Sequence, residues 1–96
     1  MPEVRQTDFF VRWLTGLRDR RARARVQARI DRLVLGNPGD VKPVGGGVSE
    51  MRVDYGPGYR VYFIDRGGAL VILPAGGSKR TQARDIAAAR ELAGNL

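Results

Sequence analysis

The sequence predicts one α+β domain over residues 1–96, with its elements in the order β-α-α-β-β-β-α. Two segments with apolar residues at helical spacing follow a short alternating segment, three strand-like segments come next, and an alanine-rich helical segment ends the chain. A domain of this size buries roughly 60 to 65 % of its unfolded surface, which leaves room for one core. We therefore expect a helical hairpin packed on a small, largely antiparallel sheet, with a C-terminal helix.

The N-terminal third is expected to form a strand and the helical hairpin. Residues 3–6 alternate polar and apolar side chains, as a short strand does, and Thr7 or Asp8 can cap the helix that follows. Five apolar side chains give this first helix one apolar stripe: Phe9, Phe10, Trp13, Leu14 and Leu17. A second helix begins near Arg20 and ends at residues 36–38, and its inward side chains are Ala22, Val26, Ile30, Leu33 and Val34.

The hairpin of residues 49–64 is the most informative segment, because one of its faces is apolar and the other is ionised. With residues 56–58 as a three-residue loop, strand alternation predicts three apolar cross-strand pairs: Tyr55 with Tyr59, Val53 with Val61, and Met51 with Phe63. The other face is expected to be exposed, and its members are Asp54 opposite Arg60, Arg52 opposite Tyr62, and Glu50 beyond them. A one-residue slip would turn the apolar side chains to water, so the pattern favours this register.

The segments on either side of the hairpin complete the sheet and the fold. Residues 39–44 are expected to form a connector that extends briefly along the sheet, where Lys42 can point to the ionised face. The near-continuous apolar run of residues 69–73 is typical of a central strand covered on both sides. A helix then begins at Lys79 or Thr81 and ends at Ala93.

Composition limits the classes of function. Lysine and arginine number 17 against 10 acidic residues, and the resulting formal charge of +7 predicts a polyanionic partner. Nucleic acid is the first candidate, because basic side chains neutralise phosphates and release counterions, and an acidic protein is the alternative. The absence of histidine and cysteine excludes a zinc hydrolase and a histidine-dependent nuclease, so we expect a metal-independent mechanism without a cofactor. Without a signal-peptide pattern or a membrane-spanning run, we expect a cytoplasmic protein that does not bind membranes.

The arginines of the second helix are the first basic feature that could form a site. Arginines at alternate positions 21, 23 and 25 do not follow one helical face. This favours a general electrostatic attractor or a docking surface over a helix that reads base sequence in a groove.

Two further basic features lie in the hairpin and after the last strand. Arg52 and Arg60 either pair with the hairpin carboxylates across the strands or bind a ligand, and we favour a functional role for Arg60. Residues 76–81 place glycines, a hydroxyl group, Lys79 and Arg80 just before a helix. Free amides and the helix dipole at such a position suit an anion, although the glycines are equally explained by a tight turn.

Together these residues resemble the RelE/ParE superfamily of type II toxin–antitoxin systems, and more closely its HigB-like addiction module killer branch. The resemblance covers almost the whole chain and is carried by these segments: Arg5-Gln6-Thr7, Arg29-Ile30-Asp31-Arg32-Leu33, residues 39–45 and 47–50, residues 51–62, and residues 76–82. It implies a RelE-like fold, in which the helical hairpin covers one face of the sheet and the other face is a basic concave surface.

The same resemblance implies an mRNA interferase, a toxin that cleaves mRNA in the ribosomal A site and thereby inhibits translation. Its implied partners are the ribosome, mRNA and a cognate DNA-binding antitoxin. The arginine of the family's Gly-Tyr-Arg motif matches Arg60, and a basic residue after the last strand matches Lys79 or Arg80. We expect these three residues to be catalytic. Substrate contacts are expected from five others: Lys42, Glu50, Arg52, Asp54 and Tyr62.

The chemistry expected at such a site needs neither histidine nor metal. Attack of a 2′-hydroxyl on the adjacent phosphate builds negative charge, which guanidinium groups stabilise with two donors at once. Family nucleases often carry a tyrosine or histidine near the C-terminus, and this chain has neither there. Either Tyr62, Glu50 or Asp85 is then the general base, or the reaction relies on the ribosome to position the RNA. Two alternatives stay open: a ParE-like inhibitor of DNA gyrase, and a non-enzymatic nucleic-acid-binding module that uses the arginines of the second helix.

Overall fold

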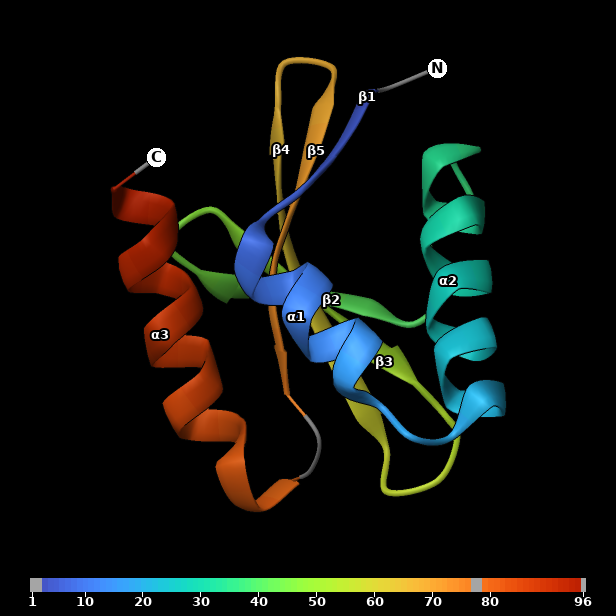
Figure 1. The fold of residues 1–96 in the computed structure, drawn as a ribbon. Coiled ribbons are helices and arrows are strands. Elements are labelled where there is room, and N and C mark those ends of the chain that lie inside the picture. The colour runs from blue at the N-terminus through green and yellow to red at the C-terminus, as the bar shows by residue number, and fades with distance from the viewer. Residues whose placement is uncertain (1–2, 77–78, 96) are drawn as a thin grey trace.

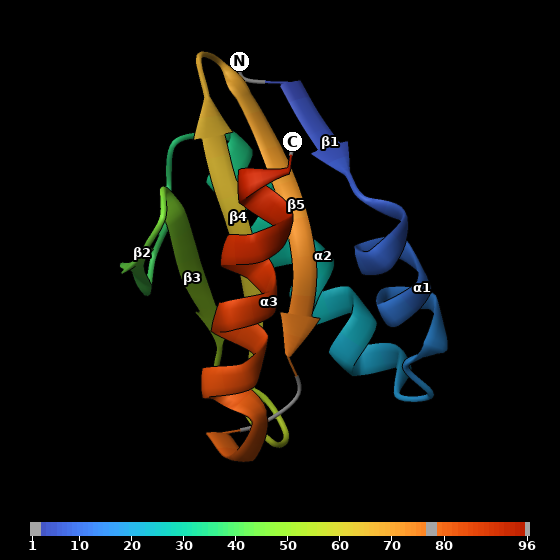
Figure 2. The ribbon, with the colours of Figure 1, turned by 90° about the vertical axis from the view of Figure 1, so that its left-hand side faces the viewer.

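The computed structural model describes residues 3–76 and 79–95, which form an α+β fold (Figure 1). Within these residues the elements are β1 (Glu3–Gln6), α1 (Asp8–Gly16), α2 (Arg20–Val34), β2 (Val41–Gly45), β3 (Val48–Val53), β4 (Tyr59–Arg66), β5 (Ala69–Gly76), a 3-10 turn (Lys79–Thr81) and α3 (Gln82–Gly94). Figure 2 shows α3 in front of β4 and β5, with α2 behind them, so the two helices cover opposite faces of the sheet. The predicted α+β class is confirmed.

The helices begin where the sequence places polar caps. Thr7 caps α1, because its Oγ1 accepts a hydrogen bond from the Phe10 N–H at 3.3 Å. Asp19 caps α2, because its carboxylate accepts hydrogen bonds from two backbone N–H groups in the first turn. Phe10 is fully buried, whereas Phe9 is 53 % exposed. Phe9 therefore does not belong to the predicted apolar stripe, since neighbouring residues of a helix point in different directions.

The sheet has the strand order β1-β5-β4-β3-β2, in which β1 is parallel to β5 and the other neighbours are antiparallel. In the described part of the chain, four strands follow the helical hairpin, so the predicted order with three strands is wrong by one element. The additional strand is β2, which was expected to be a connector. It places Val41 opposite Met51 and Lys42 opposite Glu50, and it tolerates Pro43 because it is an edge strand.

The hairpin of β3 and β4 differs from its predicted register by two residues. Met51 lies opposite Val61, Val53 lies opposite Tyr59, and Arg52 lies opposite Arg60. The loop is longer than predicted and covers residues 54–58, because a turn closes between the Gly58 N–H and the Tyr55 carbonyl at 3.1 Å. Gly56 and Gly58 have φ angles of 58° and 82° there, a backbone conformation that glycine adopts without strain. A shift of two residues keeps every side chain on its predicted face.

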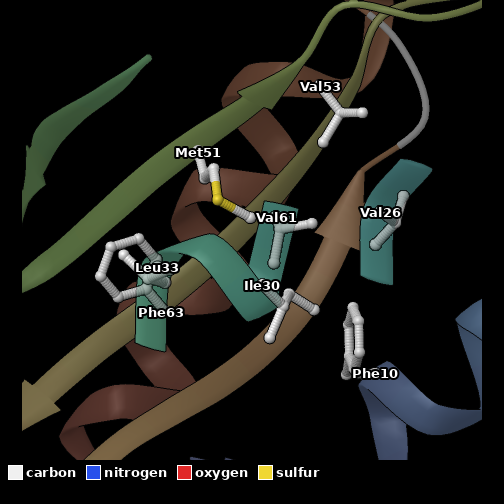
Figure 3. Close-up of a cluster of buried hydrophobic side chains, with 8 residues drawn as sticks. All are labelled: Phe10, Val26, Ile30, Leu33, Met51, Val53, Val61 and Phe63. Carbon is white, nitrogen blue, oxygen red and sulfur yellow. The ribbon is translucent and has the colours of Figure 1, made fainter. Parts of the chain in front are cut away.

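The described apolar side chains pack in two clusters, one on each face of the sheet. Figure 3 shows the cluster beneath the helical hairpin: Phe10, Val26, Ile30, Leu33, Met51, Val53, Val61 and Phe63. The second cluster joins α3 to the opposite face: Val48, Tyr62, Ile64, Ala89 and Ala93. The apolar face predicted for the hairpin is therefore confirmed, and a second packed face lies beneath α3.

The prediction of an exposed ionised face is wrong for three of its members. Glu50 and Tyr62 are fully buried and Arg60 is 4 % exposed, while Arg52 and Asp54 are exposed as expected. The cause is α3, which the sequence predicts as a helix without indicating where it packs. Because α3 lies on this face, the face is not the open concave surface that the resemblance implies. None of the helices in the described part of the chain is long and apolar enough to cross a lipid bilayer.

Candidate functional site

Two arginines face each other across the hairpin. Arg52 of β3 and Arg60 of β4 are direct cross-strand partners, so their side chains leave the same face of the sheet. Like charges at directly opposite positions destabilise an antiparallel pair. An anion held between the two guanidinium groups relieves this repulsion, and the pair is therefore a candidate anion site.

A hollow of about 240 Å³, which we name the hairpin hollow, adjoins both arginines. Its described lining residues are Asp40, Arg52, Val53, Asp54, Gly58, Tyr59 and Arg60. The lining combines guanidinium donors with carboxylate acceptors and an apolar component. Convergent polar groups in a concavity of this kind are typical of a site for a polar ligand.

Arg60 is held in place and retains an unused donor. Its Nη1 donates a hydrogen bond to the Gly58 carbonyl at 3.2 Å. Its Nε is buried without a hydrogen-bond partner among the described residues, and it lies 3.8 Å from Oε1 of Glu50, beyond hydrogen-bond distance. Leaving a buried donor unsatisfied costs about 1–3 kcal/mol. Arg60 is thus a preorganised cation at the wall of the hairpin hollow, as its expected role requires.

Glu50 is the buried anion that balances this cation. Its carboxylate accepts hydrogen bonds from the Tyr62 hydroxyl at 3.2 Å and from Nε2 of Gln82 at 3.0 Å. Oε1 of Glu50 also lies 3.8 Å from both Nε of Arg60 and Nζ of Lys42. A buried carboxylate is stable only when it is paired and hydrogen-bonded in this way. This burial argues against the expected substrate contact and base role of Glu50, and its place beside Arg60 suits a positioning role.

Tyr62 is buried and its phenol is protonated, which does not suit the expected role of a general base. Burial, followed by the neighbouring Glu50 carboxylate, raises the pKa of the Tyr62 phenol well above its usual value. The phenol therefore stays protonated near neutral pH and donates its hydrogen bond to Glu50. Tyr62 is fully buried on the face that α3 covers, so this structure does not expose it for the expected substrate contact. Asp85, the third expected base, accepts a hydrogen bond from Oγ1 of Thr81 at 2.7 Å and does not line the hairpin hollow.

Two exposed aspartates at the hairpin hollow are the carboxylates that a ligand can reach. Asp54 lies in the loop after β3, and its predicted position opposite Arg60 is wrong because the register is shifted. Asp40 precedes β2, and its Oδ2 lies 3.9 Å from Nε of Arg52. The sequence analysis did not identify Asp40, because residues 39–44 were expected to be a connector. Extending the pairing of Val41 with Met51 by one residue places Asp40 opposite Arg52. Recognising residues 41–45 as a strand in this register would therefore have identified Asp40.

The remaining expected site residues, Lys42, Lys79 and Arg80, are not among the described residues that line the hairpin hollow. Lys42 is an exposed neighbour of Glu50 on the edge strand. Arg80 is exposed in the 3-10 turn and is not among the described residues that line the hairpin hollow. The side chain of Lys79 and the expected glycine-serine step at residues 77–78 lie outside the described part of the chain. The residue that sequence reasoning missed on this side is Gln82, whose bond to Glu50 links α3 to the site across 32 positions of the chain.

Metal-ligating side chains do not gather at this site. Over residues 3–76 and 79–95, no group of three or more aspartates or glutamates comes together at a spacing that could hold a metal ion, and the chain contains no histidine or cysteine. The site thus offers guanidinium groups and two exposed carboxylates as its reactive chemistry.

Comparison with known proteins gives one close relative. The chain is 48 % identical over 94 residues to a protein of Haemophilus influenzae described as an uncharacterized protein, and the match spans 98 % of this chain and 95 % of the relative. No family model matches the chain.

Proposed function

This chain belongs to the same family as the Haemophilus influenzae protein, and we propose that it is the toxin of a type II toxin–antitoxin system with a RelE-like fold. In this proposal it is a ribosome-dependent mRNA endoribonuclease that acts in the cytoplasm and inhibits translation. The sequence resemblance to the HigB-like branch supports the assignment, and the α+β fold with a helical hairpin on one face of the sheet agrees with it.

One observation carries the proposal most strongly. Arg52 and Arg60 lie directly opposite each other at the wall of the hairpin hollow, and Nε of Arg60 has no hydrogen-bond partner among the described residues. Two guanidinium groups match the oxygens of a phosphate diester better than any neutral ligand does. A phosphate in this hollow would offset the repulsion between the two like charges.

Cleavage at this site follows from the chemistry of RNA. The 2′-oxygen attacks the adjacent phosphorus, the bond from phosphorus to the 5′-oxygen breaks, and the leaving 5′-oxygen takes a proton from water, so the products are a 2′,3′-cyclic phosphate and a 5′-hydroxyl. Negative charge grows on the non-bridging and leaving oxygens during the reaction. Arg60, fixed by Gly58 and Glu50, and Arg52 on the neighbouring strand stabilise that charge without having to reorganise.

The proton of the attacking 2′-hydroxyl needs an acceptor that RNA can reach. Asp54 and Asp40 are exposed and line the hairpin hollow, whereas Glu50 and Tyr62 are buried. We therefore assign the role of general base to one of these two aspartates. An exposed carboxylate is a weak base near neutral pH, which fits an enzyme that relies on the ribosome to hold the RNA in a reactive conformation.

Primer extension on mRNA incubated with translating ribosomes tests the proposal. Wild-type protein is expected to produce cuts, Arg60→Ala and Arg52→Ala are expected to produce none, and a reaction without ribosomes is expected to show no cleavage. Arg12→Ala is the matched control, because Arg12 is an exposed arginine of α1 that does not line the hairpin hollow. Toxicity in cells without any cut would overturn the nuclease proposal and direct attention to DNA gyrase.

Burial of Arg60 favours a second candidate, a nucleic-acid-binding module without catalysis. Arg60 is only 4 % exposed, so it reaches a phosphate through the wall of the hollow rather than by projecting from the surface. Such an arginine can fix a strand without acting on it. Tight RNA binding that depends on Arg60, together with no cleavage on ribosomes, would identify this alternative.

A further inference from the structure

Two further hollows beside α2 share lining residues with the hairpin hollow. Each has a volume of about 320 Å³. The second hollow is lined by Arg29, Arg32, Asn37, Gly39 and Asp40, and the third by Arg25, Ala28, Arg29, Arg32, Val53 and Asp54. Asp40 belongs to the first and second hollows, Asp54 to the first and third, and Arg29 to the second and third. The three hollows are therefore neighbours on the surface.

Three arginines of this surface share one face of α2. Arg25, Arg29 and Arg32 are separated by four and three residues, which is the spacing of neighbours on a helix surface. Their backbone positions are about 6 Å and about 4.5 Å apart along the helix axis. The alternate positions considered from sequence, 21, 23 and 25, do not share a face, so the structure selects a different set from the same run of arginines.

Arg29 fixes how the hollows meet. Its Nη1 donates to the Arg52 carbonyl at 2.7 Å and its Nη2 donates to the Pro38 carbonyl at 2.9 Å. A Cβ atom at Gly39 would lie 2.7 Å from Nη2 of Arg29, and the φ angle of 67° at this position favours glycine. Arg29 thus joins α2, the loop before β2 and the end of β3.

Arg25 and Arg32 are available to a ligand. The Arg25 guanidinium lies 5.5 Å from the centre of the Tyr55 ring, and the Tyr55 hydroxyl donates to Asp19 at 3.0 Å. Arg25 is therefore oriented without being neutralised by a direct ion pair. Arg32 is exposed and forms no ion pair with any described residue.

We infer that these hollows bind one continuous strand of nucleic acid, an inference that rests on the proposed function because it assigns the path of the substrate. We name the surface the arginine track and define it by five residues: Arg25, Arg29, Arg32, Arg52 and Arg60. Only Asp40 and Asp54 oppose them among the described lining residues, so the track carries net positive charge. Backbone phosphates of the strand lie at Arg25 and Arg32, and the reacting phosphate lies at Arg52 and Arg60.

The shape of the track favours a single strand over a duplex. Arg52 and Arg60 lie on the face of the sheet opposite α2, so the track passes around the end of β3 from one face to the other. A duplex is stiff over distances far longer than this domain, and its bending costs several kcal/mol at short range. A single strand follows such a curve, and its phosphates need only a positively charged path.

Fluorescence anisotropy with a 2′-O-methyl RNA strand tests the track, because this strand lacks the 2′-hydroxyl and cannot be cleaved. The wild-type protein is expected to bind a strand of about 12 nucleotides more tightly than one of about 4 nucleotides. Arg25→Gln and Arg32→Gln are each expected to lower the salt slope of binding by about 0.7. When salt rises from about 50 to about 200 mM, the factor by which affinity falls is therefore expected to be about 2.6 times smaller for each variant than for the wild type.

Two controls separate lost phosphate contacts from other effects. Arg12→Gln removes the same charge from α1 outside the track and is expected to leave the salt slope unchanged. Arg32→Lys keeps the charge and is expected to restore the wild-type slope, which excludes misfolding as the cause. Unchanged slopes in both glutamine variants would overturn the inference, as would loss of antitoxin binding in these variants with RNA binding intact.

The outcomes for the track and for the proposed function are distinct. Length-dependent binding that needs Arg25 and Arg32, together with no cleavage on ribosomes, supports the track and refutes the nuclease. Ribosomal cleavage that needs Arg60, together with wild-type binding by the two glutamine variants, supports the nuclease and refutes the track.

Discussion

The two faces of the sheet bury different kinds of side chain. The face beneath the helical hairpin packs apolar residues, of which Phe10, Val26 and Ile30 are at most 1 % exposed (Figure 3). The face beneath α3 combines the apolar residues Val48 and Ile64 with a polar network of the buried residues Glu50, Arg60 and Tyr62, to which the partly buried Gln82 adds a hydrogen bond. The difference separates what stabilises this protein from what gives it a site.

A buried ionic network is weak evidence for stability. Replacing such a network with apolar side chains of similar volume is often neutral or stabilising, while removing one partner is strongly destabilising. The polar network beneath α3 holds Arg60 at the wall of the hairpin hollow. We therefore assign most of the stability to the apolar face, and we assign the positioning of Arg60 to the polar network beneath α3.

The largest effect is expected from the apolar face. Phe10→Ala removes a fully buried aromatic ring and leaves a cavity, so the free energy of unfolding should fall by about 3–5 kcal/mol. Urea denaturation followed by circular dichroism measures this loss. Because Phe10 does not line the hairpin hollow, RNA binding by the folded fraction should be retained. A loss below about 1 kcal/mol would show that this cluster does not dominate stability.

Glu50→Ala is expected to lower the free energy of unfolding by about 3 kcal/mol, because Arg60 is then buried without its counter-charge. Glu50→Gln is the matched variant, since an amide oxygen still accepts hydrogen bonds from Tyr62 and Gln82. The free energy of unfolding should fall less in Glu50→Gln than in Glu50→Ala. Both variants should lose the ribosome-dependent cleavage that depends on Arg60. Full activity of Glu50→Ala would contradict the positioning role.

Removing the buried members of the network should separate stability from function. In the triple variant Glu50→Leu, Arg60→Met and Tyr62→Phe, the three buried polar side chains become apolar, and only the partly buried Gln82 stays polar. The free energy of unfolding is expected to rise by about 1–4 kcal/mol, while cleavage and phosphate binding are lost. Differential scanning calorimetry and the ribosome assay measure the two effects. A less stable triple variant would indicate that the polar network itself stabilises the fold.

The smallest effect is expected at alkaline pH. Burial and the Glu50 carboxylate raise the pKa of Tyr62, so its contribution to stability is complete below the unfolded-state pKa of about 10 and declines as the pH rises above it. Tyr62→Phe should therefore lose less stability than wild type between about pH 8 and about pH 11. The hydrogen bond to Asp19 also raises the pKa of Tyr55, so Tyr55→Phe is expected to change the pH profile in the same direction and serves as a comparison. Identical pH profiles of wild type and Tyr62→Phe would contradict the burial of this phenol.

Much of the fold was predictable because its signals are local. The caps at Thr7 and Asp19 and the apolar spacing of α2 depend on residues within a few positions of one another. The strand β2 was missed because its glycines and Pro43 are typical of a connector. An edge strand accepts such residues, and only pairing with β3 shows that this segment is a strand.

The candidate site was predictable in part. Arg52 and Arg60 were identified from their position in an ionised hairpin face, and the structure brings them together at the hairpin hollow. Glu50 was identified as a site residue, but its burial, which depends on α3, argues against the expected role. Gln82 was not identified, since its partner Glu50 is 32 positions away in the chain.

The sequence by itself determined which side chains share a face of the hairpin. Successive side chains of a strand point to opposite faces, so Met51, Val53 and Val61 had to face the same core in any register consistent with the apolar pattern. Only the tertiary structure decided that Arg52 lies opposite Arg60 and that Glu50 is buried. A shift of two residues preserves the pattern of faces, and the docking of α3 depends on contacts between distant segments, so neither is encoded in local periodicity.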